Sequence, residues 1–210
     1  MAKSSFRIVH LSDLHLTKRD GASRSEPKLF NKLKGMNTAF RKIVVSKPIQ
    51  KADLILVTGD VTDRGDIESW NVFWGTINDA GLKDRTHVIP GNHDVCCLGA
   101  RLPGKRKAYK DADLQKAVNG LRMGGKPTKF PWVIYPDPRV VIFGLNSNNL
   151  GNLNAVTNAM EELDYYQLSS LASKLHVYRD VPVKIVALHH SPNIPGAETA
   201  RKRGQKRRTN

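Results

Sequence analysis

Short apolar runs alternate with longer segments of helical periodicity in the first half of the chain. Three runs rich in β-branched residues, FRIVHLSD, ADLILVTGD and THVIPGN, occupy residues 6–13, 52–60 and 86–92, and each closes on Asp, Gly or Asn. Between them, apolar residues recur every three or four positions over residues 29–44 and 67–77, which is typical of amphipathic helices. This strand-helix-strand-helix-strand order predicts a parallel sheet with crossover helices.

The second half of the chain predicts a further set of strands. Residues 95–130 are rich in Gly, Pro and Lys and indicate an insertion or long loop. WVIYPDPRVVIFGLNS (132–147) predicts a hairpin that turns at Pro136-Asp137-Pro138, and a helix is expected over about 158–175. VPVKIVALHH (181–190) predicts another buried strand.

The chain is strongly basic. Its 210 residues, enough for one well-packed domain, carry 34 Lys and Arg against 19 Asp and Glu, a net charge of +15. Nine basic and two acidic residues lie between Arg101 and Lys129, and six basic and no acidic residues lie in the last ten. Charge of this size favours a polyanionic partner such as nucleic acid. The alternative is a solvated loop and a disordered tail.

The sequence predicts a cytoplasmic protein without membrane contact. No apolar stretch approaches the roughly 20 residues that a membrane helix needs, and the N-terminus lacks the apolar region of a signal peptide. Cys96 and Cys97 are adjacent, so they cannot link distant segments as a disulfide framework would. The sequence does not predict the oligomeric state.

Side chains that can bind metal follow four of these strands. Polar groups gather beyond the carboxyl ends of strands in such sheets. Each group alone is typical of turns and helix caps, but their joint occurrence at four strand ends predicts a metal site. The four groups are Asp13-Leu14-His15, Gly59-Asp60 with Asp63-Arg64-Gly65, Gly91-Asn92-His93-Asp94, and His189-His190.

These motifs together resemble those of a known family. HLSDLHL, VTGDVTDRG, IPGNHD and ALHHSP, in this order and at these spacings, resemble the successive motifs of the calcineurin-like metallophosphoesterases, especially their phosphodiesterase-like bacterial members. The resemblance implies an α/β fold with a central β-sandwich flanked by helices, in four layers α-β-β-α. It implies a metallophosphoesterase domain over residues 1–192, followed by a basic, disordered tail over 193–210.

The resemblance also implies a centre of two metal ions, Mn, Fe or Zn, that hydrolyses phosphomonoesters or phosphodiesters. Asp13 and His15 would hold the first metal, Asp60 would bridge both, and Asn92 would bind the second. In this family the fourth-motif ligand commonly stands two residues before a proline, which favours His190 over His189.

Three further residues are expected to act in catalysis. His93 would protonate the leaving oxygen or stabilise the transition state, and Asp94 would orient it. Arg64 resembles an arginine that faces the phosphate in some branches of the family, although a structural salt bridge is an equal alternative.

One family motif is missing. The family closes its site with Gly-His-x-His on a later strand, and this sequence stops 18 residues after Pro192 without it. His10, His87 and His176 do not replace it and are expected to be structural. The chain is therefore expected to lack the C-terminal strands, either as a truncated form or as a variant with an incomplete centre. Two functions stay open: a metal-dependent phosphoesterase, or a weak or inactive relative that binds nucleic acid through its basic segments.

Overall fold

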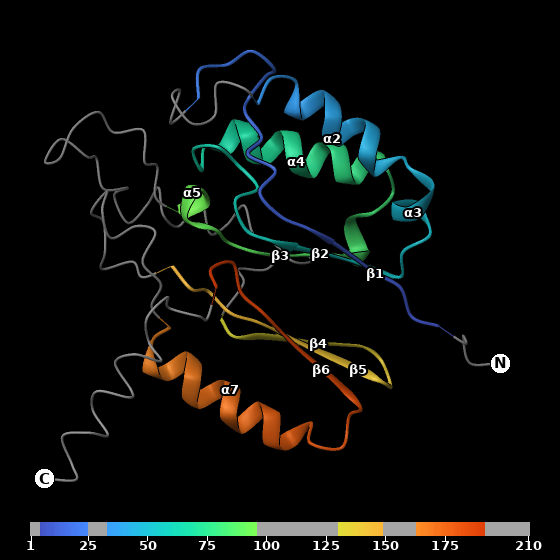
Figure 1. Cartoon of the computed structure of the whole chain (residues 1–210), viewed down its shortest axis with the longest axis vertical. Helices are drawn as coiled ribbons and strands as arrows, with labels where there is room; N and C mark the ends of the chain where they lie inside the picture. Colours follow the sequence, from blue (N-terminus) through green and yellow to red (C-terminus); the bar gives the residue numbers. More distant parts are fainter. Residues whose placement is uncertain (1–4, 25–32, 96–129, 149–162, 192–210) are drawn as a thin grey trace, which may run out of the picture.

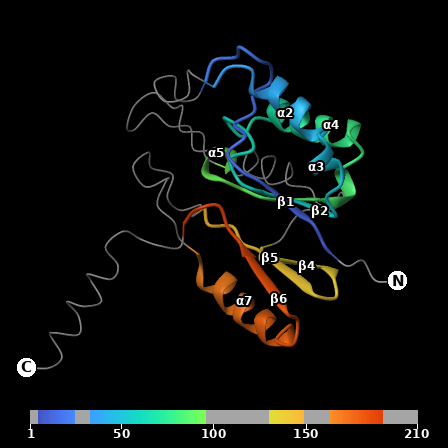
Figure 2. The same cartoon turned by 45° about the vertical axis from the view of Figure 1, so that its right-hand side comes forward.

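Two three-stranded sheets lie face to face, with helices on the outer side of each (Figure 1). The computed structural model describes residues 5–24, 33–95, 130–148 and 163–191. The predicted four-layer α-β-β-α arrangement is confirmed, and a second view shows the same layers (Figure 2). The basic insertion, apart from its ends, and the tail over 193–210 lie outside the described residues.

The first sheet is parallel, as predicted. In spatial order its strands are β1 (Ile8–Leu11), β2 (Leu54–Thr58) and β3 (Thr86–Ile89), and both neighbouring pairs are parallel. The crossovers contain α2 (Met36–Val44), α3 (Lys47–Gln50), α4 (Ile67–Asp79) and a 3₁₀ turn (Lys83–Arg85). A short helix, α5 (Asn92–Val95), follows β3.

Local sequence explains where α4 begins and which side it buries. The Asp66 side chain accepts a hydrogen bond from the backbone N–H of Ser69 at 2.9 Å, which caps the first turn. Trp70, Phe73 and Ile77 then recur at helical spacing and are all buried. This stripe packs α4 against the first sheet.

The second sheet combines a hairpin with a parallel strand. It contains β4 (Trp132–Asp137), β5 (Val140–Gly144) and β6 (Val183–Ala187), in that order, with β4 and β5 antiparallel and β5 and β6 parallel. The hairpin is confirmed, but it turns at Pro138-Arg139 because Asp137 accepts the backbone N–H of Arg139 at 2.9 Å. The helix α7 (Tyr165–Val177) covers the outer face and is capped by Asp164.

Alternate residues of β2 pack in opposite directions. Leu54 and Leu56 belong to the apolar cluster between the two sheets, whereas Ile55 and Val57 belong to the cluster under α2 and α4. This is the two-residue period of a strand that is covered on both faces. Packing on both faces therefore fixes the position of the strand from which the next loop starts.

Within the described residues, no helix combines the length and apolar character that a membrane crossing requires. The cytoplasmic location stays a prediction.

Candidate metal centre

The loops after β1 and β2 have strained backbones. Asp13, His15 and Asp60 have positive φ angles of 56°, 43° and 50°, and they are the described non-glycine residues with this conformation. Such a backbone costs about 1–3 kcal/mol per residue and persists only where its surroundings enforce it. Here the two loops hold each other, because the backbone N–H of His15 donates to the carbonyl oxygen of Asp60 at 2.8 Å.

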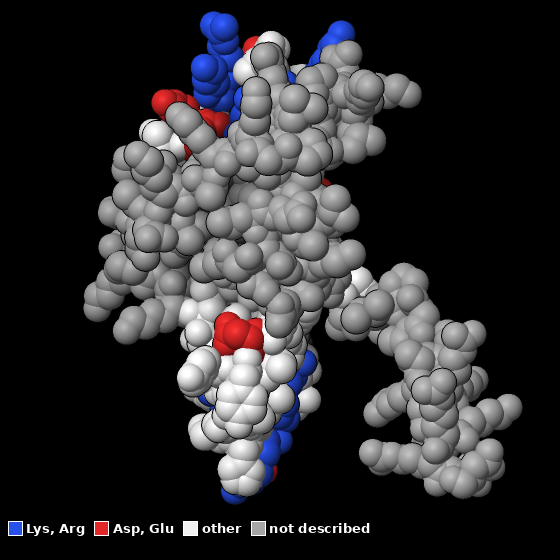
Figure 3. Space-filling view, turned by 90° about the vertical axis from the view of Figure 1, so that its left-hand side faces the viewer, with Lys and Arg blue, Asp and Glu red and all other residues white. Residues whose placement is uncertain are grey.

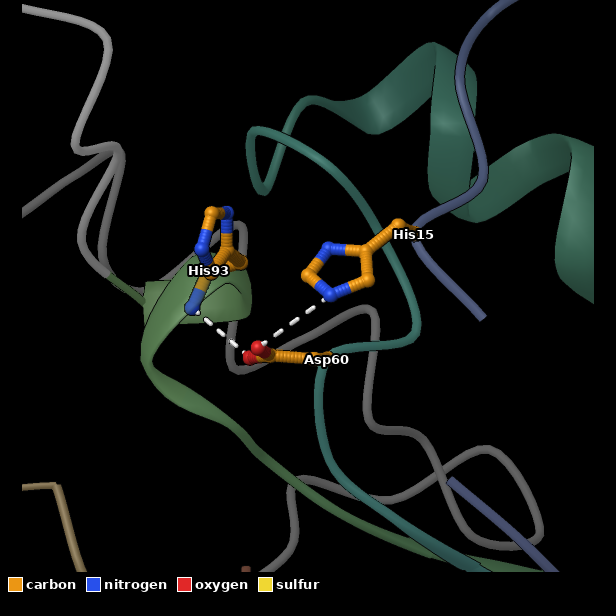
Figure 4. Close-up of side chains that lie close together, drawn as sticks. All are labelled: His15, Asp60 and His93. Atoms are coloured by element: carbon orange, nitrogen blue, oxygen red, sulfur yellow. Dashed lines mark hydrogen bonds and ion pairs between the residues drawn. The ribbon is translucent and has the colours of Figure 1, made fainter. Parts of the chain in front are cut away.

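The carboxylate of Asp60 lies at the centre of the site. Its side chain is almost fully buried, and His15 Nε2 lies 3.7 Å from Oδ2. On the other oxygen, His189 Nε2 lies 3.5 Å from Oδ1, and the backbone N–H of His93 donates to Oδ1 at 2.9 Å. Figure 4 shows the His15 ring approaching this carboxylate from the loop after β1, and the backbone nitrogen of His93 approaching it from the start of α5 (Asn92–Val95).

Two groups of potential ligands share Asp60. One contains His15, Asp60 and His93, and the other contains Asp13, Asp60 and His189; within each group the ligand atoms lie within 4.8 Å of one another. Imidazole and carboxylate donors suit Mn, Fe and Zn. A carboxylate common to both groups has one oxygen for each of two cations, so the donors present fit a two-metal centre.

Two glycines let these groups come together. A Cβ atom on Gly91 would collide with the backbone nitrogen and carboxylate of Asp60, and one on Gly59 would collide with the imidazole of His189. Gly59 also has a φ of 83°, which side chains rarely tolerate. Larger residues at either position would displace the ligands.

The buried charges shift the pKa values of the site. Burial disfavours the charged form of Asp60 and by itself would raise its pKa. The hydrogen bond and the charge of His189, with smaller contributions from His93, outweigh burial and lower the Asp60 pKa. Burial also disfavours the His189 cation, yet Asp60 raises the His189 pKa to about 9. The pKa of His15 is lowered, chiefly by burial. His15 is thus held in the neutral form that metals bind.

The two adjacent histidines have different surroundings. Nδ1 of His189 lies 2.8 Å from the carbonyl oxygen of Thr58, which turns Nε2 toward Asp60. Nδ1 of His190 lies 2.8 Å from Ser147 Oγ, while its buried Nε2 has no hydrogen-bond partner among the described residues. The structure therefore places His189, and not His190, against Asp60. The choice of His190 as the ligand stays a prediction.

Asn92 and His93 begin the short helix α5, beside Asp60. Both are buried, with exposed fractions of 8% and 4%. The ring of His93 packs edge to face on His15, with centroids 4.7 Å apart, and its Nδ1 lies 3.0 Å from the carbonyl oxygen of Asp63. The contact with Asp63 fixes the orientation of the His93 ring.

Asp94 ties the loops after β2 and β3 together. Its carboxylate accepts backbone N–H groups from Val61 at 3.2 Å, Thr62 at 2.8 Å and Gly91 at 2.9 Å. Burial, together with the charge of Asp60, raises the Asp94 pKa to about 6 despite these bonds. These contacts hold the loop after β2 against the loop after β3. The expectation that Asp94 orients His93 stays a prediction.

Arg64 lies at the edge of the site. It donates to the carbonyl oxygen of Arg24 at 2.7 Å, and its Nε lies 3.6 Å from the buried carboxylate of Asp63. Its side chain is 39% exposed. The salt bridge that the sequence left as an alternative is present, and the role at the phosphate stays a prediction.

The remaining histidines lie outside both ligand groups. His10 Nε2 lies 2.6 Å from Thr58 Oγ1, and His87 packs on Trp132 with ring centroids 6.1 Å apart. His176 is in the last turn of α7 and is exposed.

From the sequence, Asp63 is only a member of the second strand-end group with no role of its own, and the segment after β5 belongs to no group. Asp63 is fully buried, between Arg24 and Arg64, and its carbonyl oxygen holds the His93 ring. Ser147 and Asn148 follow β5, and the Asn148 amide donates to the carbonyl oxygen of Pro90 at 3.0 Å. The rule that found the other strand ends would also have found GLNSNN at the end of β5.

Comparisons with known proteins agree on one family. The family model described as calcineurin-like phosphoesterase matches residues 6–208. A probable glycerophosphodiester phosphodiesterase GpdQ of Arcobacter nitrofigilis is 27% identical over 195 residues, which cover 91% of this chain but only 59% of that protein. The 3',5'-cyclic adenosine monophosphate phosphodiesterase CpdA of Pseudomonas aeruginosa is 37% identical over 95 residues, 43% of this chain and 31% of that protein.

A solved structure shows the same fold. A dimetal phosphatase from Danio rerio superimposes with a TM-score of 0.57 at 12% identity, covering 88% of this chain and 69% of the other. With the family match over nearly its whole length, the chain belongs to the calcineurin-like phosphoesterases.

Proposed function

We propose that this chain hydrolyses phosphate esters, and phosphodiesters in particular, with two metal ions held around Asp60. The observation that carries the proposal is that Asp60 belongs to both groups of potential ligands. The groups also contain His93 and His189, whereas we assign the ligand roles to the neighbouring Asn92 and His190. The names of the relatives, a glycerophosphodiester phosphodiesterase and a cyclic nucleotide phosphodiesterase, support diesters as substrates. The metals would be Mn, Fe or Zn, which these donors suit.

The ligands we propose come from four strand ends. Asp13 and His15 would hold one metal, Asp60 both, and Asn92 and His190 the other. The strained backbone at three of these residues supports a functional role, because strain of this kind clusters at active sites. When bound, the metals would supply the positive charge that lowers the pKa of a water molecule and stabilises the phosphoryl group.

The proton donor in this proposal is His93. Its Nδ1 is engaged with the carbonyl oxygen of Asp63, so its other ring nitrogen would transfer the proton to the leaving oxygen. Asp94 would keep α5 at the correct distance from the loop after β2 through its backbone contacts. Arg64, at the edge of the site, would stabilise charge on the phosphate.

Metal-dependent hydrolysis of bis(p-nitrophenyl) phosphate tests the proposal. The wild-type chain should hydrolyse this diester when Mn²⁺ is added and lose activity in a chelator. Asp60→Asn removes one of the two carboxylates among the proposed ligands, so it should lose both metals and the activity. Asp79→Asn is the matched control, because Asp79 is an exposed carboxylate at the C-terminal end of α4. An active Asp60→Asn with unchanged metal content would contradict the proposal.

The alternative, a weak or inactive relative that binds nucleic acid, depends on basic stretches outside the described residues. A chain that does not hydrolyse the diester at any metal concentration, but binds DNA with a steep salt dependence, would favour it.

A further inference from the structure

A cavity of about 460 Å³ lies beside the candidate metal centre. Its walls are formed by the two chain segments that continue from the ligands: Thr17 follows His15 by two residues, and Arg64 follows Asp63, whose carbonyl oxygen contacts His93. This volume is typical of pockets for small molecules. No residue that we propose as a metal ligand lines it, so the cavity adjoins the centre and shares with the proposed catalytic residues only Arg64.

Among the described residues, three cationic side chains line the cavity: Lys18, Arg19 and Arg64. Lys18 and Arg19 are exposed on the loop after β1. Arg64 is anchored on one side by the Arg24 carbonyl oxygen and the Asp63 carboxylate. Seen from the side of the strand ends, Lys and Arg side chains gather at the upper end of the molecule, next to a smaller group of Asp and Glu (Figure 3).

Two carboxylates, Asp66 and Glu68, also line the cavity, but they are partly compensated. Asp66 Oδ1 accepts both the backbone N–H of Ser69 at 2.9 Å and its hydroxyl at 2.8 Å, so this oxygen serves the start of α4. Glu68 lies in the first turn of the same helix, whose positive end offsets negative charge. Cationic side chains therefore outnumber carboxylates at the cavity, by three to two among the described lining residues.

We propose that this cavity binds a second anionic group of the substrate, a phosphate or a carboxylate. This group would be on the alcohol of the diester that is not the leaving group. The inference rests on the phosphodiesterase function proposed above. Lys and Arg side chains form charge-assisted hydrogen bonds with such groups, and the anchored Arg64 is already oriented. None of the described residues that line the cavity is aromatic, so these residues offer no surface on which a nucleobase would stack.

A series of 4-nitrophenyl diesters with one leaving group tests the proposal. The second alcohol would be glycerol 3-phosphate, glycerate, glycerol or choline, which differ mainly in charge. We expect kcat/KM to be about tenfold higher for one or both anionic esters than for the glycerol ester, the gain from a charge-assisted contact, and lowest for choline. The better of the phosphate and carboxylate esters identifies the anion. Equal values across the series would overturn the proposal.

A double variant tests whether the cavity causes this preference for anionic esters. Lys18→Gln/Arg19→Gln should bring the ratio of anionic to neutral ester close to one. Lys51→Gln should keep the wild-type ratio, because this exposed lysine precedes β2 at the opposite end of the sheet. A double variant with the full anionic preference would overturn the assignment.

Binding of inorganic sulfate to the full chain gives a readout that does not need catalysis. Affinity should fall about tenfold in Lys18→Gln/Arg19→Gln and stay unchanged in Lys51→Gln. If the chain binds sulfate in this way but hydrolyses no ester, anion binding by the cavity stands and the proposed function is wrong. If the chain hydrolyses all four esters equally and the double variant binds sulfate as tightly as the wild-type chain, the proposed function stands and anion binding by the cavity is wrong.

Discussion

The imidazole of His189 lies against the carboxylate of Asp60, with Nε2 3.5 Å from Oδ1. His189 follows β6 of the second sheet, whereas Asp60 follows β2 of the first. The site is therefore assembled across the sandwich, and its geometry depends on the apolar cluster that joins the two sheets. A substitution that loosens this packing would be expected to separate the two residues.

The first prediction separates the roles of the two adjacent histidines. Both nitrogens of His189 already face oxygen atoms, while the buried Nε2 of His190 has no partner among the described residues. We expect His190→Ala to lower metal affinity by about 10–100-fold, the size of effect seen when a metal site loses a supporting group. His189→Ala should retain both metals. Metal content after dialysis measures both.

The opposite outcome is equally informative. If His189→Ala loses a metal and His190→Ala does not, the ligand is the residue that the structure places beside Asp60, and the assignment to His190 is wrong.

The second prediction concerns His93 as the proton donor. His93→Ala should lower kcat by about 10²–10⁴-fold for a diester with an alkyl leaving group, while metal content persists. The loss should be smaller for a 4-nitrophenyl leaving group, which departs without a proton. An equal loss for both leaving groups would argue against proton donation, and loss of the metals would show that His93 is a ligand.

Much of the fold could be predicted from the sequence because burial leaves a clear pattern. β2 is buried on both faces and is a continuous apolar run, and α4 shows its stripe at helical spacing. The turn between β4 and β5 lies later in the chain than the sequence predicts. Its position is set by the hydrogen bond from the backbone N–H of Arg139 to the side chain of Asp137. Such a bond leaves no periodic signal.

Much less of the site geometry could be predicted. The strand ends identified the residues that converge, since the carboxyl ends of parallel strands meet at one edge of a sheet. The partners of each side chain depend on loop conformation instead. The carboxylate of Asp94 contacts backbone N–H groups, and the ring of His93 contacts the Asp63 carbonyl oxygen. Backbone partners carry no residue-type signal, so no motif could reveal them.

The third prediction compares two glycines with positive φ. Gly81→Ala should lower the free energy of unfolding by about 1 kcal/mol, because its φ of 70° is strained for alanine but nothing lies within 4 Å of the new Cβ. Gly59→Ala, at a φ of 83°, adds a collision with His189 and should cost a further ~1–3 kcal/mol. Urea unfolding measures both, and equal losses would show that His189 moves aside without cost.

The fourth prediction concerns His87, which faces the interior between the sheets. Its Nδ1 is buried without a hydrogen-bond partner in the described part of the chain, and burial lowers its pKa from the ordinary value of 6.5. Above pH 6.5 the imidazole is neutral in both the folded and the unfolded chain. Below it, the unfolded chain takes up the proton first, so stability should fall by up to ~1.4 kcal/mol per pH unit until the folded pKa is reached.

His87→Gln should remove this contribution, because the amide does not titrate. Urea unfolding from pH 8 to pH 5 should therefore show a shallower loss of stability in the variant than in the wild-type chain. His176→Gln is the control, since it removes an imidazole that is exposed at the end of α7, and it should keep the wild-type slope. If His87→Gln and the wild-type chain lose stability in parallel as the pH falls, His87 is protonated in the folded chain as readily as in the unfolded one, and burial does not control its charge.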